Sequence, residues 1–310
     1  MSEYNIRKIT TKKIFIRDDY ISLAKSFMSL PIFNATNKKP SESDFLTIET
    51  RDLFQYKNIR IATPLLSLNF DFNILLFLIK EAVVAEDKNV IFIEYSKLFK
   101  FLKVSSTNSP LYRTKTKDTF SKLQMFSMRF EKGGREYLLG FVGDVIEVEG
   151  GLSVTVSMGL KIFYEADRDL IFNLEVERFN KLKSSFARAL FLFYKSNNYK
   201  KTNTFKIQDL IYRLQCSDND SKEVNRNLKR AHDELVKSGL IHSVREIKDV
   251  VNKRKTVKFA VVVNIATDKE TEEQQTETVE KVKSTASDIR AKAKSDEDFM
   301  FFAEDDTMFN

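Results

Sequence analysis

The chain has 310 residues, a formal net charge of +7, 42% hydrophobic residues and one cysteine. This length allows two ordinary domains with tails, and 27 phenylalanines can fill two cores. One cysteine excludes an internal disulfide, the first residues lack the apolar segment of a secretory signal, and the apolar stretch 74–85 is too short to span a bilayer. We therefore expect a cytoplasmic protein without a membrane segment.

The charge is distributed unevenly along the chain. Residues 266–310 contain 13 acidic and 6 basic residues, a net charge of −7, which leaves +14 on residues 1–265. A body this basic fits a polyanionic partner, although charge alone is also compatible with an ordinary soluble surface.

The N-terminal part is expected to form an arm. Residues 1–44 are polar and lysine-rich, and an amphipathic patch at 20–30 allows one helix before Pro31. We interpret 1–44 as a flexible N-terminal arm. Residues 45–63 follow with the pattern of two short strands that enter the first domain.

A first structural unit, called here the first copy, begins near Leu66. Its pattern predicts an apolar helix over 68–85, a strand over 90–95, a helix over 97–104 and a turn-rich loop. A third helix over about 111–130 places four residues on its inward face: Thr116, Phe120, Leu123 and Ser127. Three strand-like runs follow Gly133 and Gly134, over 136–142, 144–150 and 152–158. The first run is expected to form one side of a hairpin and the last to close the sheet.

The second copy begins near Val176 and repeats this order. One long amphipathic helix is predicted over 176–196, then a short strand, a second helix over 206–216 and a third helix that starts at Ser221 and ends near Gly239. Two strands over 240–247 and 256–265 complete it. When one copy is shifted by 112 positions, apolar residues coincide, as Leu98 does with Leu210 and Leu123 with Leu235.

Helix, strand, two helices and a hairpin form the order of the winged helix, a helix-turn-helix with a β-hairpin wing. The sequence thus predicts an α+β fold with tandem winged-helix domains, suited to one extended duplex site. We place the N-terminal arm at 1–44, the first domain at 45–170, the second at 171–265 and an acidic, disordered tail at 266–310.

The third helix of the second copy is the best candidate for reading bases. Val224, Leu228, Ala231 and Leu235 recur at helical spacing and should face the core. The other faces then present the side chains that bind guanine and adenine edges in the major groove. These base-reading candidates are Lys222, Asn225, Arg226, Lys229 and Arg230. The alternative is a solvated helix face, which is common for lysine and arginine.

Other cations fit contacts to phosphates. Lys248, Lys253, Arg254 and Lys255 lie on or beside the second hairpin and suit the backbone or the minor groove. The third helix of the first copy carries Arg113, Lys115, Lys117 and Lys122 in a mixed surface. We hypothesise that the second copy reads bases, while the first copy binds the DNA backbone or a second protomer. An ordinary hairpin tip and an ordinary helix surface remain the alternatives.

The sequence argues against an enzyme. The two histidines, His232 and His242, do not form a paired metal motif, one cysteine gives no zinc spacing, and no phosphate-binding GxxxxGK[ST] loop is present. We expect no catalytic residue, no metal and no cofactor. The tail ends in an acidic segment with Phe299, Phe301, Phe302 and Phe309. This segment fits a partner's basic apolar groove or the protein's own basic surface, or it only aids solubility.

In its tandem architecture and in two segments, VERFNKLKSSFARALFLFYKSNN and SKEVNRNLKRAHDELVKSGLI, the chain resembles plasmid replication initiators of the two-winged-helix, iteron-binding type. The resemblance covers roughly 45–265. It implies that the C-terminal domain makes the main base contacts and that the N-terminal domain adds backbone contacts and dimerisation. It also implies that monomers initiate at directly repeated origin sites and that dimers repress the initiator's own promoter, which controls copy number. The long acidic tail is not a general trait of this family.

The expected partners are double-stranded DNA, a second protomer in a monomer–dimer equilibrium, and the host helicase and initiator. Origin opening would follow from bending of the DNA, without any catalytic residue. Two other functions share the local features. One is a tandem winged-helix transcription regulator, and the other is a phage or primosomal replication factor that acts mainly through protein contacts.

Overall fold

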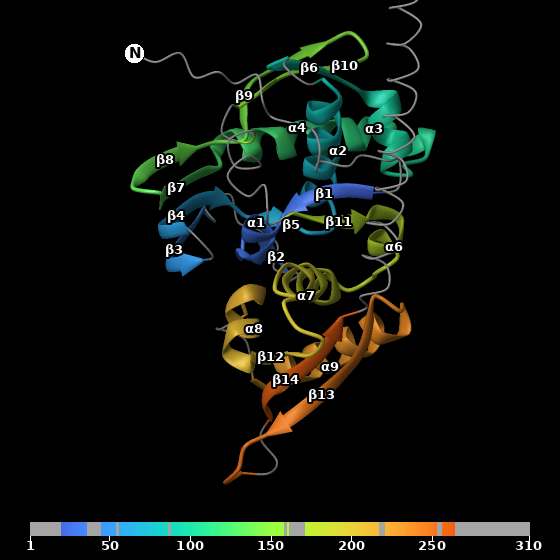
Figure 1. The fold of residues 1–310 in the computed structure, drawn as a ribbon. Helices are drawn as coiled ribbons and strands as arrows, with labels where there is room; N and C mark the ends of the chain where they lie inside the picture. Colours follow the sequence, from blue (N-terminus) through green and yellow to red (C-terminus); the bar gives the residue numbers. More distant parts are fainter. Residues whose placement is uncertain are drawn as a thin grey trace, which may run out of the picture. The chain divides into compact units, whose positions relative to one another are not determined.

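A computed structural model describes residues 20–35, 45–53, 56–85, 88–157, 160, 171–216, 221–252 and 256–263 (Figure 1). All of these belong to one unit of the chain, Met1–Val263, and they contain both helices and strands, so the predicted α+β class is confirmed. Lys253, Arg254, Lys255 and the whole tail, with Phe299, Phe301, Phe302 and Phe309, lie outside the described residues.

A segment near the N-terminus is built into the body. It consists of β1 (Tyr20–Ala24), α1 (Lys25–Ser29) and β2 (Phe33–Asn34). Strand β1 pairs antiparallel with β11 (Ile171–Glu175), and β2 pairs parallel with β5 (Leu66–Ser67). Because Ile21, Leu23 and Ile32 are buried, the prediction of a flexible arm is wrong for residues 20–35. The apolar patch does contain one short helix, α1, and its apolar side chains are part of the core.

The first copy begins with α2 (Asp71–Val84), followed by β6 (Val90–Glu94), α3 (Tyr95–Phe101), a 3₁₀ turn (η2, Ser106–Asn108) and α4 (Ser109–Met125). Its hairpin consists of β9 (Val142–Val148) and β10 (Gly151–Val156). Strand β6 pairs with β10, so the sheet has the order β6-β10-β9. Helix α2 is buried along most of its length, as its apolar sequence predicts.

The second copy has α6 (Val176–Asn180), α7 (Ser185–Ser196), β12 (Asn203–Lys206), α8 (Ile207–Leu214) and α9 (Ser221–Lys237). Its hairpin, β13 (Ile241–Lys248) and β14 (Thr256–Val263), joins β12 in the order β12-β14-β13 (Figure 1). This order matches that of the first copy. Helices α4 and α9 are both 17 residues long and start at Ser109 and Ser221, 112 positions apart, so the predicted repeat is confirmed through the third helix.

The prediction of one long helix over 176–196 is wrong. The chain leaves the helix after α6, and a new helix begins at Ser185. The Oγ of Ser184 accepts the amide of Ala187 at 3.4 Å and caps α7, while the Glu234 carboxylate accepts the amides of Lys183 and Ser184. These acceptors satisfy amides that a continuous helix would have bonded internally, which explains the break.

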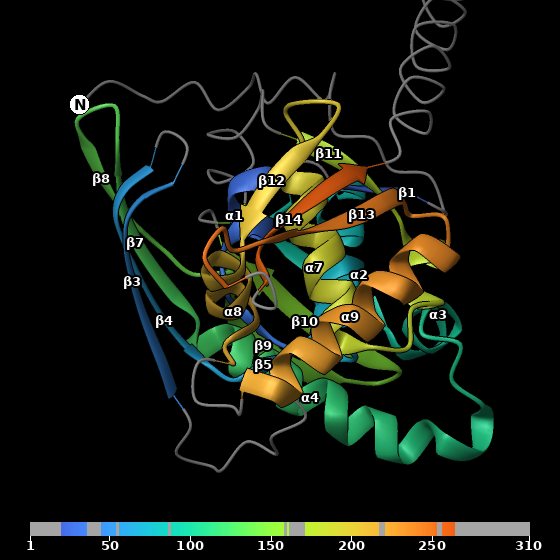
Figure 2. The ribbon, with the colours of Figure 1, turned by 90° about the horizontal axis from the view of Figure 1, so that it is seen from below.

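The first copy also carries an additional sheet. Strands β3 (Phe45–Leu53) and β4 (Tyr56–Pro64) form the two predicted strands, and β7 (Ser127–Lys132) and β8 (Arg135–Leu139) extend them to the order β3-β4-β7-β8 (Figure 2). The third helix therefore ends at Met125 rather than near 130, and Ser127 belongs to a strand. The run 136–142 was expected in the wing, but β8 pairs with β7 instead.

The sequence around β7 accounts for this difference. Burial alternates along β7, with Met128 and Phe130 buried and Arg129 and Glu131 exposed, which is the period of a strand. Gly133 and Gly134 have φ values of +59° and +73°, the conformation that a tight two-residue hairpin turn requires. The β7–β8 hairpin is thus an insertion between the third helix and the hairpin of the first copy, and it extends the β3–β4 pair that precedes α2.

Candidate nucleic-acid interface

Helix α9 has one face in the core and its other faces exposed. Val224, Leu228, Ala231 and Leu235 are buried, as their spacing predicts. The exposed residues of its N-terminal half include all five base-reading candidates, Lys222, Asn225, Arg226, Lys229 and Arg230. Helical geometry thus gathers these side chains along the part of the helix that helix-turn-helix proteins insert into the major groove.

Four of these five side chains form no hydrogen bond or ion pair with the described residues, and one of the four, Lys229, acts on Glu246 through its charge. Within the part of the chain that the structure describes, Asn225, Arg226, Lys229 and Arg230 make no side-chain hydrogen bond or ion pair. Lys222 does take part in an interaction. Exposed donors without internal partners keep their hydrogen-bonding capacity for a ligand and lose only water when they bind it.

The C-terminal half of α9 is fixed by polar contacts. The Tyr194 hydroxyl lies 2.7 Å from the Nε2 of His232, and the Glu234 carboxylate accepts the amide of Lys183 at 2.5 Å. The guanidinium of Arg178 donates to the carbonyl of Gly239 at 2.9 Å, just beyond the helix. Polar contacts therefore fix the C-terminal half of the helix, while the buried Val224 and Leu228 hold its N-terminal half and leave the cations on the exposed side.

His232 is a packing residue. Its ring stacks on Tyr194 and lies 4.6 Å from the ring centroid of Phe259. Burial lowers the pKa of His232 to about 4, so the imidazole is neutral near pH 7. His242 lies exposed on β13, and the described residues contain no cluster of three side chains able to hold a metal ion.

The hairpin of the second copy lies beside α9 (Figure 2). Lys248, near its tip, donates to the Thr256 hydroxyl at 2.6 Å and to the carboxylate of Glu246. The hydrogen bond from Lys248 is the largest cause that lowers the pKa of Glu246, and the charge of Lys229 adds to it. Lys248 is thus partly neutralised by its own strand, and the three cations that follow lie outside the described residues.

The third helix of the first copy uses its cations differently. The Lys122 ammonium lies 3.2 Å from the buried carboxylate of Asp71, and Lys117 lies 3.1 Å from Glu147. Arg113 and Lys115 each sit 5.2 Å from an aromatic ring centroid, those of Tyr95 and Tyr112. All four predicted phosphate-contacting cations of α4 therefore have a partner within the protein, in contrast to Arg226 and Arg230 of α9.

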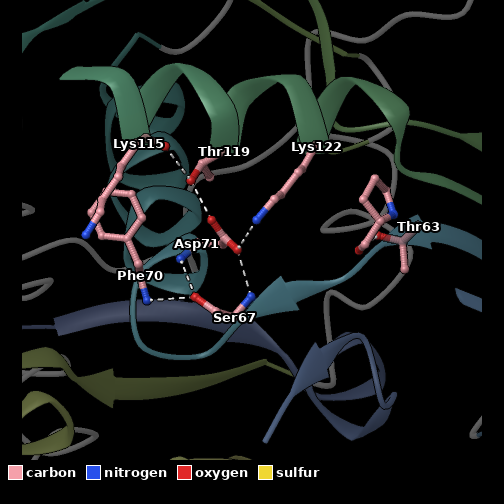
Figure 3. Close-up of polar contacts among 8 residues, drawn as sticks. Thr63, Ser67, Phe70, Asp71, Lys115, Thr119 and Lys122 are labelled. Carbon is pink, nitrogen blue, oxygen red and sulfur yellow. Dashed lines mark hydrogen bonds and ion pairs between the residues drawn. The ribbon is translucent and has the colours of Figure 1, made fainter. Parts of the chain in front are cut away.

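Asp71 forms the centre of a polar network that the sequence reasoning missed (Figure 3). Its carboxylate accepts the Thr119 hydroxyl at 2.5 Å, the amide of Ser67 at 2.7 Å and the Lys122 ammonium at 3.2 Å. The Ser67 hydroxyl in turn accepts the amides of Phe70 and Asp71, a reciprocal arrangement that resembles a capping box. The network joins the start of α2 to α4.

The second copy holds its third helix by the reverse arrangement. Shifting Asp71 and Lys122 by 112 positions gives Lys183 and Glu234, so the carboxylate moves from the first helix to the third. There it accepts the amide of Lys183 instead of an ammonium. This exchange of charge was visible in the sequence, since both pairs follow the same offset.

No protein-family model matches the chain, and no curated protein sequence matches it. A crystal structure of domains 2 and 3 of RctB is similar with a TM-score of 0.51 and 12% identity, covering 77% of this chain and 97% of that chain. A second crystal structure of these RctB domains gives a TM-score of 0.47 at 12% identity, covering 78% and 97%.

A third similar structure is that of the Pi initiator protein in complex with iteron DNA. Its TM-score is 0.46 at 18% identity, and the match covers 62% of this chain and 88% of that chain. The first comparison shows that the chain has the fold of RctB domains 2 and 3. Among the described residues, no helix is long and apolar enough to cross a membrane.

Proposed function

We propose that this protein is a sequence-specific double-stranded DNA-binding protein that initiates plasmid replication at repeated origin sites. The observation that carries the proposal is the exposed row Asn225, Arg226, Lys229 and Arg230, which forms no hydrogen bond or ion pair with the described residues and lies on a helix whose other face is buried. Bidentate arginine and asparagine donors on such a helix can distinguish guanine and adenine edges.

The fold supports the same function. Each copy is a helix, strand, two helices and a hairpin with the same sheet order, and we interpret both copies as winged helices. A tandem pair fits an extended duplex site. The free donors of α9 favour base reading by the second copy, while the internally paired cations of α4 favour backbone contact or protomer contact by the first copy.

Several finer parts of the proposal rest on the sequence. They are repression of the protein's own promoter, copy control, a monomer–dimer equilibrium and recruitment of the host helicase and initiator. We also propose that the protein is cytoplasmic and uses no catalytic residue or cofactor. The wing cations Lys253, Arg254 and Lys255 are proposed to contact phosphates. The phenylalanines of the tail are proposed to contact a partner.

The experiment that tests the proposal is footprinting on the DNA that flanks the gene, at two salt concentrations and with excess random duplex. Protection of evenly spaced direct repeats that resists the competitor is expected. Affinity should fall steeply with salt, because phosphate contacts release counterions. Protection of one inverted repeat at the promoter would favour a transcription regulator.

If excess random duplex abolishes binding to every site equally, the protein does not bind DNA in a sequence-specific way. That result would favour a replication factor that acts through protein contacts. A plasmid that lacks its own initiator gene provides the second readout. Replication restored by supplying this protein in trans supports an initiator, whereas footprints without replication support a regulator.

A further inference from the structure

The hairpin of the second copy ends in two valines that the rest of the protein leaves uncovered. Val250 is 91% exposed and Val251 is 94% exposed, the highest values among the large hydrophobic residues that the structure describes. Single exposed apolar side chains are common on protein surfaces, but these two are adjacent and both are almost fully in contact with water. We call this pair the apolar tip.

Polar contacts hold the backbone that carries the apolar tip. Lys248 donates to the Thr256 hydroxyl at 2.6 Å and so joins the two strands of the hairpin. The Asp249 carboxylate accepts the amides of Val251 and Asn252 at 2.8 and 2.9 Å. In Figure 1 this end of the hairpin extends farther than α8 and α9. The tip is thus presented on a fixed turn, which reduces the entropy lost on binding.

The apolar tip lies toward the base-reading half of α9. Strand β13 begins just after α9 ends, packs on the helix and runs back along it. Glu246 of this strand and Lys229 of α9 line the same groove, and the charge of Lys229 acts on Glu246. Val250 follows Glu246 by four positions in the chain. A duplex that holds α9 in its major groove therefore presents its adjoining backbone and minor groove to the tip.

Cations flank the apolar tip in the sequence and favour DNA as its partner. Lys248 precedes the tip, and Lys253, Arg254 and Lys255, which lie outside the described residues, follow it. Such cations bind phosphates, but valine side chains offer no hydrogen bond to a phosphate or to a base edge. Apolar side chains in a minor groove act instead by insertion between base pairs, which unstacks them and kinks the duplex.

The hairpin of the first copy lacks these features. Two residues, Glu149 and Gly150, join β9 to β10, whereas seven residues, 249–255, join β13 to β14. Residues 142–156 contain the carboxylates of Asp144, Glu147 and Glu149 and no cation. The apolar tip thus belongs to the second copy alone, which is the copy proposed to read bases.

We propose that Val250 and Val251 insert into the minor groove beside the site read by α9, unstack one base step and kink the duplex. This inference rests on the proposed DNA-binding function and adds the residues that deform the DNA. Burial of the two side chains offsets part of the cost of unstacking. That cost is lowest at flexible pyrimidine–purine steps, so the tip acts at such a step.

The test compares the full-length protein with the variant Val250→Ser, Val251→Ser on the footprinted DNA that flanks the gene. Gel shifts on circularly permuted fragments measure the bend, and permanganate reactivity of thymines measures unstacking. The serine variant should halve the bend or reduce it further and lower the reactivity at least fivefold, while its affinity stays within tenfold. Val250→Ile with Val251→Ile should retain both effects. Val84→Ser with Val90→Ser, the same change at two exposed valines of the first copy, should change neither.

A second measurement needs no specific site. At low salt, the affinity for a random duplex is compared with the affinity for the same duplex with one mismatched step. A mismatched step is already partly unstacked, so the protein should bind it at least threefold more tightly. The serine variant should show no such preference, and the same preference in both proteins would overturn the proposal.

The outcomes separate this inference from the proposed function. Absence of a specific footprint, with a mismatch preference that the serine variant loses, would reject the proposed function and leave the inserted tip standing. A specific footprint with no bend, or with a bend that the serine variant retains, would overturn the inserted tip and leave DNA binding standing. A serine variant that bends DNA normally but no longer supports plasmid replication would assign the tip to a protein partner, which also overturns the proposal.

Discussion

Arg226 is the residue on which base recognition should depend most. It is exposed on the N-terminal half of α9 and forms no hydrogen bond or ion pair with a described residue, so its guanidinium can bind a base edge without breaking an internal bond. Arg226→Ala should weaken binding to the cognate site by about 1–3 kcal/mol and relax discrimination at one base pair. Quantitative gel shifts on sites with single base changes measure both effects.

The matched control for this prediction is Arg60→Ala. Arg60 forms an exposed ion pair with Glu49 on the four-stranded sheet, away from α9. Its removal should leave the affinity for the cognate site unchanged. If Arg226→Ala weakened all sequences equally, and if Lys115→Ala relaxed discrimination, the roles assigned to the two copies would be reversed.

His232 should make stability depend on pH. Its pKa is lowered from 6.5 to about 4 in the folded state, mainly by burial, so the unfolded state binds a proton first as the pH falls. Stability should therefore be complete above about pH 6.5 and should decrease between pH 6.5 and 4, by at most about 3 kcal/mol. Urea unfolding at pH 7 and pH 5 measures the change.

A double variant isolates the histidine from other titrating groups. Tyr194→Phe with His232→Phe removes both members of the buried hydrogen bond and leaves neither without a partner. The position equivalent to His232 in the first copy is Phe120, which is buried, so a phenylalanine suits this environment. The loss of stability between pH 7 and 5 should be smaller in this variant, and an unchanged loss would assign the pH dependence to other residues.

A carboxylate fixes the third helix of each copy, Asp71 for α4 and Glu234 for α9. Removal of Asp71 tests this role in the first copy. Asp71→Ala leaves the Thr119 hydroxyl, the Ser67 amide and the Lys122 ammonium without their common acceptor. We expect a loss of about 2–4 kcal/mol in the free energy of unfolding, because these donors lie at a buried carboxylate. Chemical denaturation monitored by circular dichroism gives this value.

Asp118→Ala serves as the control on the same helix. Asp118 is exposed, so its removal should change stability by no more than about 0.5 kcal/mol. The second variant, Asp71→Ala with Lys122→Met, removes the unpaired ammonium and should recover part of the loss. A loss no larger than that of Asp118→Ala would show that the network does not fix α4.

At the scale of the whole molecule, the segment 20–35 connects the two copies. It pairs with β11 beside the second copy and with β5 at the entrance to the first, and its helix α1 packs on α7. Ser29 donates to the Ser196 hydroxyl at 2.8 Å, and the buried Arg213 donates to the carbonyl of Met28 at 3.4 Å. The segment therefore belongs to the core of both copies.

Leu23→Ala tests this role. Leu23 is fully buried in β1, so its truncation should cost about 2–5 kcal/mol and lower the midpoint of the unfolding of both copies together. The control is Val90→Ala on β6, where the side chain is 54% exposed and little should change. A flexible arm would instead tolerate Leu23→Ala as well as the control, as followed by denaturant unfolding.

Local patterns in the sequence were enough to predict several elements. The helical spacing of Val224, Leu228 and Leu235 identified the inward face of α9 and, with it, the exposed cationic face. The repeat at 112 positions predicted that α4 and α9 occupy equivalent places in the two copies. These features follow from the period of a helix and need no knowledge of distant residues.

Features that depend on partners far along the chain could not be predicted from local patterns. Ser22 and Asn173, 151 positions apart, share a hydrogen bond of 2.8 Å in the pairing that orders the N-terminal segment. The break before α7 depends on Glu234. The strands of the first wing depend on the pairing of β7 with β4 and β8, which removes β8 from the wing. A strand or a helix end takes its partner from the whole fold, so local patterns alone leave several partners of similar energy.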